Sequence, residues 1–257
     1  MPTPAIPVEL WRARVRPLDP AFLVPADRRR WDELTMAADR DRLATAVRLR
    51  NHVLRAHGHP TQVCRWCAVC RSAGHGAIRA PGPLSWRMSV SHADEMVVIA
   101  YAESASIELG VDIEQIARFR PEMAPFVLGR GEAGGGAVEL AETWTAKEAV
   151  LKAAGCGLHV NPTALAVRRR APGGAAVGVL TPHPLLAPVR DRPGVLTDVT
   201  TTLGLDRAAW RAALFVLGVT RIDLRVRPFT GEGTPARRAP GGHCCSTPGD
   251  PASRTCC

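Results

Sequence analysis

The sequence predicts an α+β protein built from two similar halves. An amphipathic helix precedes a group of strands near the N-terminus, and the same order recurs in the second half. The composition, 46% hydrophobic and 22% charged among 257 residues, is ordinary for a globular chain. We expect two α+β subdomains, residues 1–105 and 106–229, related by a pseudo-twofold axis, with a boundary near Ser104–Glu108.

The first half should contain one long helix and then strands. Apolar residues fall on one stripe within residues 27–57, which predicts a helix that stops near Gly58. Residues 64–83 are rich in Cys, Gly and Pro and should form a loop. Three closely spaced strands predict an antiparallel meander: Leu84–Val90, Met96–Tyr101 (joined through Ala93–Glu95) and Ile107–Ile113.

The second half repeats this order. Residues 139–154 should form a helix that ends near Gly155. Beyond Thr230 the composition shifts to Gly, Pro, Ser, Thr, Arg and Cys, so we expect residues 230–257 to be disordered. Short strands are predicted at Ala164–Val167, Ala176–Leu180, Ala212–Leu217 and Ile222–Val226.

The charge distribution favours acidic partners. The net charge is +9, and of 33 basic residues only Lys147 and Lys152 are lysine. Lysine is a compact charge that can lose its proton, whereas arginine stays charged, so two lysines five residues apart indicate positions that require lysine itself. The chain has neither an apolar run of membrane-spanning length nor a secretory signal, and we expect a cytoplasmic protein without a membrane partner.

Two carboxylates lie on one face of a predicted strand. Asp112 and Glu114 are two residues apart, so their side chains point the same way while Val111 and Ile113 point into the core. Adjacent like charges repel, which predicts a cation between them, and oxygen ligands suit Mg²⁺. A solvated strand face is the alternative interpretation.

The helix at residues 139–154 adds a third carboxylate. Glu148 and Lys152 are four residues apart and share one helix face, and Lys147 adjoins Glu148. Together with the strand, this helix predicts a magnesium-dependent site for a phosphate-bearing substrate. An ordinary amphipathic helix with one Glu–Lys pair is the alternative.

These motifs resemble those of a known enzyme family. The segments Gly110–Glu114 and Trp144–Lys152 look like the two signatures of Sfp-type 4′-phosphopantetheinyl transferases, at that family's spacing. Upstream, Ser89–Ala93 resembles its Ser-His motif and Arg42 its N-terminal arginine. Cys67-x-x-Cys70, followed by His75-Gly76, is similar to a loop of actinobacterial members.

The resemblance implies a reaction and a metal. These enzymes move the phosphopantetheine arm of coenzyme A onto a serine of an apo acyl or peptidyl carrier protein and release adenosine 3′,5′-bisphosphate. By similarity, Asp112, Glu114 and Glu148 would hold Mg²⁺, with Mn²⁺ as the alternative. Lys152 would contact the transferred phosphate, and either Lys152 or Glu148 would be the base. The carrier would belong to polyketide or non-ribosomal peptide synthesis, with fatty-acid carriers as the alternative.

The resemblance also implies the contacts with coenzyme A. Arg42 and His92 would bind its 3′-phosphate, and Ser91 would lie near the diphosphate or the adenine. His75 belongs to the loop on the adenine side. Lys147 would contact the ribose phosphate or form a salt bridge.

The acidic carrier protein would suit the basic surface. Three apolar residues after the strand motif, Phe119, Met123 and Phe126, are candidates for docking it, with core packing as the alternative. We expect a monomer that binds no nucleic acid.

The chain departs from the family at three places. Ala77–Arg79 stands where the family has Lys-Pro after its glycine, and Asn51 stands at its second N-terminal arginine. A glycine-rich stretch, 129–136, replaces a Phe-Ser-x-x-Glu element, whose glutamate corresponds to Glu132. A degenerate paralogue that binds carrier proteins without activity is therefore one alternative.

A zinc-knuckle-like nucleic-acid-binding protein is the other alternative. Cys64, Cys67, Cys70 and His75 could ligate zinc, and the chain is basic. Against this, C-x2-C-x2-C is awkward for one tetrahedral site, and 5% aromatic residues are few for base stacking. A structural zinc at Cys67 and Cys70 would be compatible with the transferase interpretation.

Overall fold

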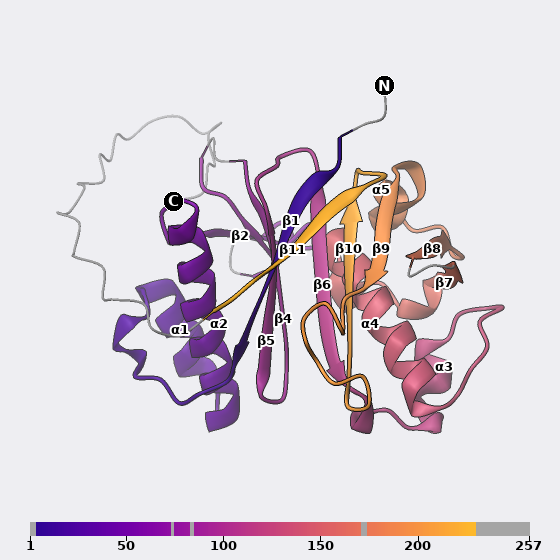
Figure 1. Ribbon diagram of the computed structural model, residues 1–257, viewed down its shortest axis with the longest axis horizontal. Coiled ribbons are helices and arrows are strands. Elements are labelled where there is room, and N and C mark those ends of the chain that lie inside the picture. Colours follow the sequence, from indigo (N-terminus) through magenta and orange to yellow (C-terminus); the bar gives the residue numbers. More distant parts are fainter. Residues whose placement is uncertain (1–3, 73–74, 83–84, 171–173, 230–257) are drawn as a thin grey trace.

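The computed structural model describes residues 4–72, 75–82, 85–170 and 174–229. Its helices and sheets are arranged in four layers (Figure 1). Two β-sheets pack face to face at the centre, and helices cover the outer face of each. The predicted mixed α+β class is confirmed. The pseudo-twofold relation between the halves stays a prediction, and the proposed disordered tail, residues 230–257, lies outside the described residues.

The first sheet has six strands in the order β11-β1-β5-β4-β3-β2. All of its neighbours pair antiparallel except β1 and β11, which run parallel. Its strands are β1 (Ile6–Arg14), β2 (Cys64–Trp66), β3 (Ala77–Arg79), β4 (Arg87–Ala93), β5 (Met96–Ala102) and β11 (Ile222–Arg227).

The second sheet has five strands in the order β6-β10-β9-β8-β7. Every neighbouring pair is antiparallel. Its strands are β6 (Glu108–Gln115), β7 (Leu165–Arg170), β8 (Gly174–Val179), β9 (Gly194–Asp198) and β10 (Trp210–Leu217).

Two long helices cover the sheets. The α2 helix packs on the first sheet and α4 on the second. The helices are α1 (Pro25–Glu33), α2 (Ala37–Ala56), α3 (Ala124–Val127), α4 (Ala137–Ala153) and α5 (Ala187–Asp191). Short 3-10 turns lie at Pro20–Phe22, Ile116–Arg118, Pro121–Met123, Gly157–His159, Pro162–Ala164 and Pro184–Leu186. Within the described part of the chain, no helix has the length and apolar character needed to cross a bilayer.

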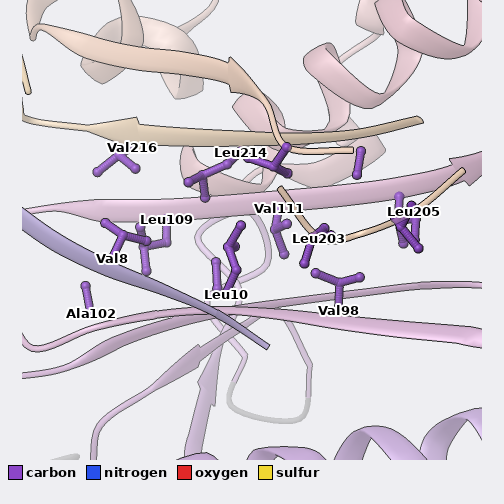
Figure 2. Packing of buried hydrophobic residues seen from close by; sticks show 14 of the residues in the cluster. Val8, Leu10, Val98, Ala102, Leu109, Val111, Leu203, Leu205, Leu214 and Val216 are labelled. Atoms are coloured by element: carbon purple, nitrogen blue, oxygen red, sulfur yellow. The ribbon is translucent and has the colours of Figure 1, made fainter. Parts of the chain in front are cut away.

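The main core lies between the two sheets (Figure 2). Val8 and Leu10 of β1 face Val111 of β6 and Leu214 of β10, and all four are fully buried. Each such side chain contributes about 1.5–3 kcal/mol to folding through the removal of apolar surface from water. This core fixes β6, the strand that carries Asp112 and Glu114.

The long helix predicted at residues 27–57 is two helices. The α1 helix ends before Leu34, and α2 begins after Met36, both of which are extended. Arg40 reaches back across the break, because its Nε donates to the Leu34 carbonyl at 2.8 Å and its guanidinium lies over the Trp31 ring. The predicted stop is confirmed, since α2 ends at Ala56 and Gly58 has a φ of +72°.

The predicted three-stranded meander is wrong in its third strand. The β4 and β5 strands form the expected hairpin, whose turn holds Asp94 at a φ of +45°. The next strand, β6, instead pairs with β10 of the second sheet. Alternating apolar residues fix which face of a strand is buried, but they do not identify its partner.

The second half of the chain does not map onto the second sheet alone. Its last strand, β11, returns to the first sheet and pairs with β1. The predicted loop at residues 64–83 contains the short hairpin of β2 and β3. The pattern also missed β9 and β1. In β1, Glu9 is buried and accepts hydrogen bonds from Trp11 and Arg227.

Candidate active site

A pocket of about 640 Å³ lies between α2, the edge of the first sheet and the C-terminal end of α4. The α4 helix ends at Ala153, and Gly155, two residues later, has a φ of +74° that turns the chain across the pocket wall. Seven basic side chains line this pocket, together with the acidic Glu33 and Asp39, and a basic lining of this kind favours an anionic ligand. The basic residues are Arg30, Arg50, Arg65, His75, His92, Lys152 and His159.

Gly110 brings α4 close to β6. A Cβ atom at this position would lie 1.8 Å from the Ala149 carbonyl oxygen and 2.7 Å from the Ala153 nitrogen. Only glycine therefore allows the helix to cross the strand at this distance. This close approach places Glu148 and Lys152 of α4 above the polar face of β6.

Asp112 is the centre of the resulting cluster. Its Oδ1 accepts hydrogen bonds from the Ser91 hydroxyl at 2.7 Å and from the Lys152 ammonium at 2.6 Å. Its Oδ2 is buried and has no hydrogen-bond partner among the described residues, and the same holds for Oε1 of Glu148. Two buried carboxylate oxygens without donors fit a bound cation, since an unpaired buried charge is costly.

The electrostatics of the cluster support this interpretation. Burial, and then the charge of Asp112, raises the pKa of Glu114 to about 7, although Arg118 opposes the shift. Burial also raises the pKa of Glu148 to about 7; Lys152 opposes that shift and Asp112 adds to it. The carboxylates thus repel one another, and a divalent cation among Asp112, Glu114 and Glu148 would relieve this repulsion.

Lys152 connects the carboxylates with the pocket. Besides Asp112, its Nζ donates to the Ser91 hydroxyl at 2.9 Å and to the Val111 carbonyl at 3.3 Å. Ser91 and Lys152, predicted from separate motifs, therefore lie together, with Lys152 at the pocket wall.

His92 and Arg42 lie on the same side of the site. Loss of hydration, and then the charges of Lys152 and Arg42, lowers the pKa of His92, although part of its ring stays exposed. Arg42 is held by Asp39 and donates its Nε to the Asp94 carbonyl at 3.0 Å. His92 therefore lies within electrostatic range of both Lys152 and Arg42.

Lys147 does not belong to this site. The structure contradicts the predicted contact between its side chain and a ribose phosphate. Its side chain is 0% exposed; its ammonium contacts Glu132 and donates to the Val127 carbonyl at 2.7 Å. Glu132 also accepts from the backbone of Gly129 and Val167, so the ion pair fixes the glycine-rich segment. The predicted alternative, a salt bridge, is confirmed.

His75 lies at the pocket wall, on the loop between β2 and β3. Its Nε2 is 3.0 Å from the Cys70 thiol. Asn51, which stands where the resembling family has a second arginine, is buried and accepts from its neighbour Arg50, a pocket residue.

The three apolar residues that follow β6 lie in two different environments. Phe119 and Met123 pack in a small cluster with Val127 and Leu140, which confirms core packing for this pair. Phe126 is 69% exposed and stays available to a partner.

The sequence reasoning missed several residues of the site. Arg118 lies 3.6 Å from Glu114, and its spacing of four residues was a usable signal. Ser89 accepts from the Val111 amide at 3.0 Å and ties β4 to β6. Arg65 gave no signal, because its position depends on the β2–β3 hairpin.

Comparison with known proteins agrees with this geometry. Residues 108–191 match the model of the 4′-phosphopantetheinyl transferase superfamily. The matched segment is about a third of the chain and contains the three carboxylates and Lys152. Over residues 108–191 the chain therefore resembles a superfamily that acts on coenzyme A and carrier proteins, typically with a divalent metal. No curated protein matches the chain, and no finding supports a nucleic-acid-binding role.

Proposed function

We propose that this protein is an Sfp-type transferase that moves the 4′-phosphopantetheine arm of coenzyme A onto a serine of an apo acyl or peptidyl carrier protein. The observation that carries the proposal is the cluster of the buried Asp112 and Glu148 with the half-buried Lys152 at the end of a basic pocket. Carriers of polyketide and non-ribosomal peptide synthesis are the proposed substrates. One chain supplies every residue of the site, so a monomer would suffice.

Asp112, Glu114 and Glu148 would hold Mg²⁺ or Mn²⁺. The metal, when bound, would neutralise charge on the diphosphate as its bridging bond breaks. The two buried oxygens without donors, one on Asp112 and one on Glu148, are the protein's contribution to this fit.

The remaining steps use the chain's own side chains. The serine oxygen of the carrier attacks the phosphorus that bears the pantetheine arm. The new P–O bond forms as the bond to adenosine 3′,5′-bisphosphate breaks, and the leaving oxygen keeps the electron pair. Lys152 would stabilise charge on the transferred phosphoryl group, while Arg42 and His92 would hold the 3′-phosphate.

Glu148 is the better candidate for the base. Lys152 already donates to three acceptors and so acts as an ammonium ion. Glu148, whose pKa burial raises to about 7, could instead take the serine proton, directly or through water, on the carboxylate oxygen that does not bind the metal.

Mass spectrometry of apo carrier proteins tests the proposal. After incubation with coenzyme A and Mg²⁺, the carrier should gain one phosphopantetheine arm. Glu148→Gln should lower the rate by about 10³-fold or more, whereas Glu139→Gln, on an exposed position of the same helix, should not. If several carriers bind without gaining the arm, the chain is an inactive carrier-binding paralogue and the proposal fails.

A further inference from the structure

A second group of ligating side chains lies outside the carboxylate cluster. The thiols of Cys67 and Cys70 and a ring nitrogen of His75 all lie within 4.8 Å of one another. Cys67 is buried, whereas Cys70 and His75 are exposed. We propose that these three residues bind one zinc ion, which fixes the loop between β2 and β3 at the wall of the pocket.

The donor atoms suit zinc in type and spacing. Zinc prefers thiolate sulfur and imidazole nitrogen in a tetrahedron, where bonds of about 2.0–2.3 Å put neighbouring ligand atoms about 3.5–4 Å apart. The Cys70 sulfur and His75 Nε2 are 3.0 Å apart, so a small outward shift admits the ion. Because two of the ligands face solvent, water would take the fourth position.

The backbone around the two cysteines forms a turn that is closed by two hydrogen bonds. The Arg71 amide donates to the Cys67 carbonyl at 2.9 Å, and the Cys67 amide donates to the Ser72 carbonyl at 3.0 Å. Arg71 has a φ of +55°, a conformation that residues other than glycine rarely adopt. The closed turn directs both thiols toward one point.

A close approach between Gly76 and the end of β2 brings His75 near the two thiols. Gly76 has a φ of +95°, and a Cβ there would lie 2.3 Å from the Trp66 carbonyl oxygen and 2.7 Å from the Cys67 Cα. The start of β3 therefore lies directly against the end of β2. Since His75 precedes Gly76, its ring is held beside the Cys67–Cys70 turn.

The hairpin needs such a support. Its two strands have three residues each and pair at Cys64–Arg79, Arg65–Ile78 and Trp66–Ala77, at the edge of the first sheet. So short a pair gains little stability from its own ladder. Cys67, His75 and Gly76 also line the pocket, so the zinc would stabilise a wall of that cavity and would take no part in the carboxylate chemistry.

Metal analysis of the purified full-length chain tests this proposal, independently of any transferase activity. The starting protein should carry Ser at Cys244, Cys245, Cys256 and Cys257, so that the tail thiols add no background. We expect about one zinc ion per chain. Its Co²⁺ form should show the intense visible absorption of tetrahedral thiolate-bound cobalt.

The variants then identify the ligands. Cys67→Ser/Cys70→Ser and His75→Ala should each reduce zinc to below about a tenth of an ion per chain. Cys64→Ser, a neighbouring thiol outside the group, should keep the ion. Because the variants could unfold, the unsubstituted protein is also treated with a chelator that removes zinc but not magnesium, and its melting temperature should fall.

Three results would overturn the inference. The first is a protein isolated under reducing conditions without zinc that also fails to bind added zinc. The second is a mass two hydrogens lower with the thiols of Cys67 and Cys70 joined, which would indicate a disulfide. The third is zinc retained by Cys67→Ser/Cys70→Ser but lost from Cys64→Ser.

Discussion

At the scale of single residues, the two lysines of the chain separate into two roles. Lys152 connects the carboxylates with the pocket, whereas Lys147 is sealed in the interior against Glu132. Burial lowers the pKa of Lys147, and the Glu132 carboxylate opposes that shift. A compact ammonium fits this enclosed site where a planar guanidinium would not. The rarity of lysine thus indicated two special positions, but only the fold could tell which one is structural.

The Lys147–Glu132 pair predicts a large stability effect. Lys147→Met leaves the Glu132 carboxylate without its cation, so the free energy of unfolding should fall by about 3–5 kcal/mol. Urea denaturation measures this loss. The double variant Lys147→Met/Glu132→Gln should recover part of it because the unpaired charge is gone, and a double variant no more stable than the single one would contradict this account.

The carboxylate cluster predicts a dependence on pH in the metal-free protein. Both Glu114 and Glu148 have folded pKa values raised from 4.5 to about 7, so the folded state holds their protons more tightly than the unfolded state. Stability should therefore fall as pH rises from about 4.5 to about 7, and remain low above that range.

Magnesium should reverse that loss. Because Mg²⁺ binds the ionised carboxylates, it should raise the melting temperature more at pH 8 than at pH 5. Differential scanning calorimetry with and without Mg²⁺ makes the comparison. The variant Asp112→Asn should lose most of the increase, and an equal increase at both pH values would contradict a carboxylate site.

At the scale of elements, the contact between α4 and β6 depends on having glycine, which has no side chain, at position 110. Gly110→Ala would place a methyl group 1.8 Å from the Ala149 carbonyl oxygen, so the helix must move away from the strand. We expect a stability loss of about 1–3 kcal/mol or more and the loss of transfer activity. Denaturant unfolding and the carrier assay measure the two effects.

Gly178→Ala is the matched control for this change. Gly178 also lies in a strand, β8, but its added Cβ would meet only the Ala166 carbonyl oxygen, at the ordinary distance of 3.9 Å. Its stability should change by less than about 0.5 kcal/mol. Equal effects at Gly110 and Gly178 would mean that the close approach of α4 to β6 is not essential.

The elements also show how far the sequence could predict this fold. The β4–β5 hairpin and the polar face of β6 follow from local periodicity, and the end of helix α4 follows from the nearby Gly155. The partner of β6 does not, because pairing with β10 joins residues about a hundred positions apart. The sheet to which β11 belongs could not be predicted for the same reason. Its alternating apolar residues predict a strand, but they do not predict that this strand pairs with β1.

The candidate site was predicted better than the fold around it. Its three carboxylates, Lys152 and Ser91 lie in compact motifs whose spacing already places them on shared faces. The sequence had named Cys64, Cys67, Cys70 and His75 as candidate zinc ligands, but it could not show which of them lie close together. The structure instead groups Cys67 and Cys70 with His75 and leaves Cys64 outside the group.

At the scale of the whole molecule, charge and shape act together on the proposed carrier. The chain carries a net charge of +9, and the exposed Phe126 lies in the same segment as the exposed Arg120. An acidic carrier would be attracted by the basic surface and would dock around Phe126. Such attraction acts through solvent and is screened by salt, with a Debye length that falls from about 10 Å at 0.1 M to about 3 Å at 1 M.

Raising the salt concentration from about 50 to about 500 mM should therefore increase the KM for the carrier at least about threefold, with little change in kcat. Arg120→Glu should raise the KM at low salt and flatten its salt dependence. Arg29→Glu, on α1 at the opposite end of the molecule (Figure 1), changes the net charge equally and should have a much smaller effect. Equal effects of the two substitutions would mean that net charge, rather than a docking face around Phe126, guides the carrier.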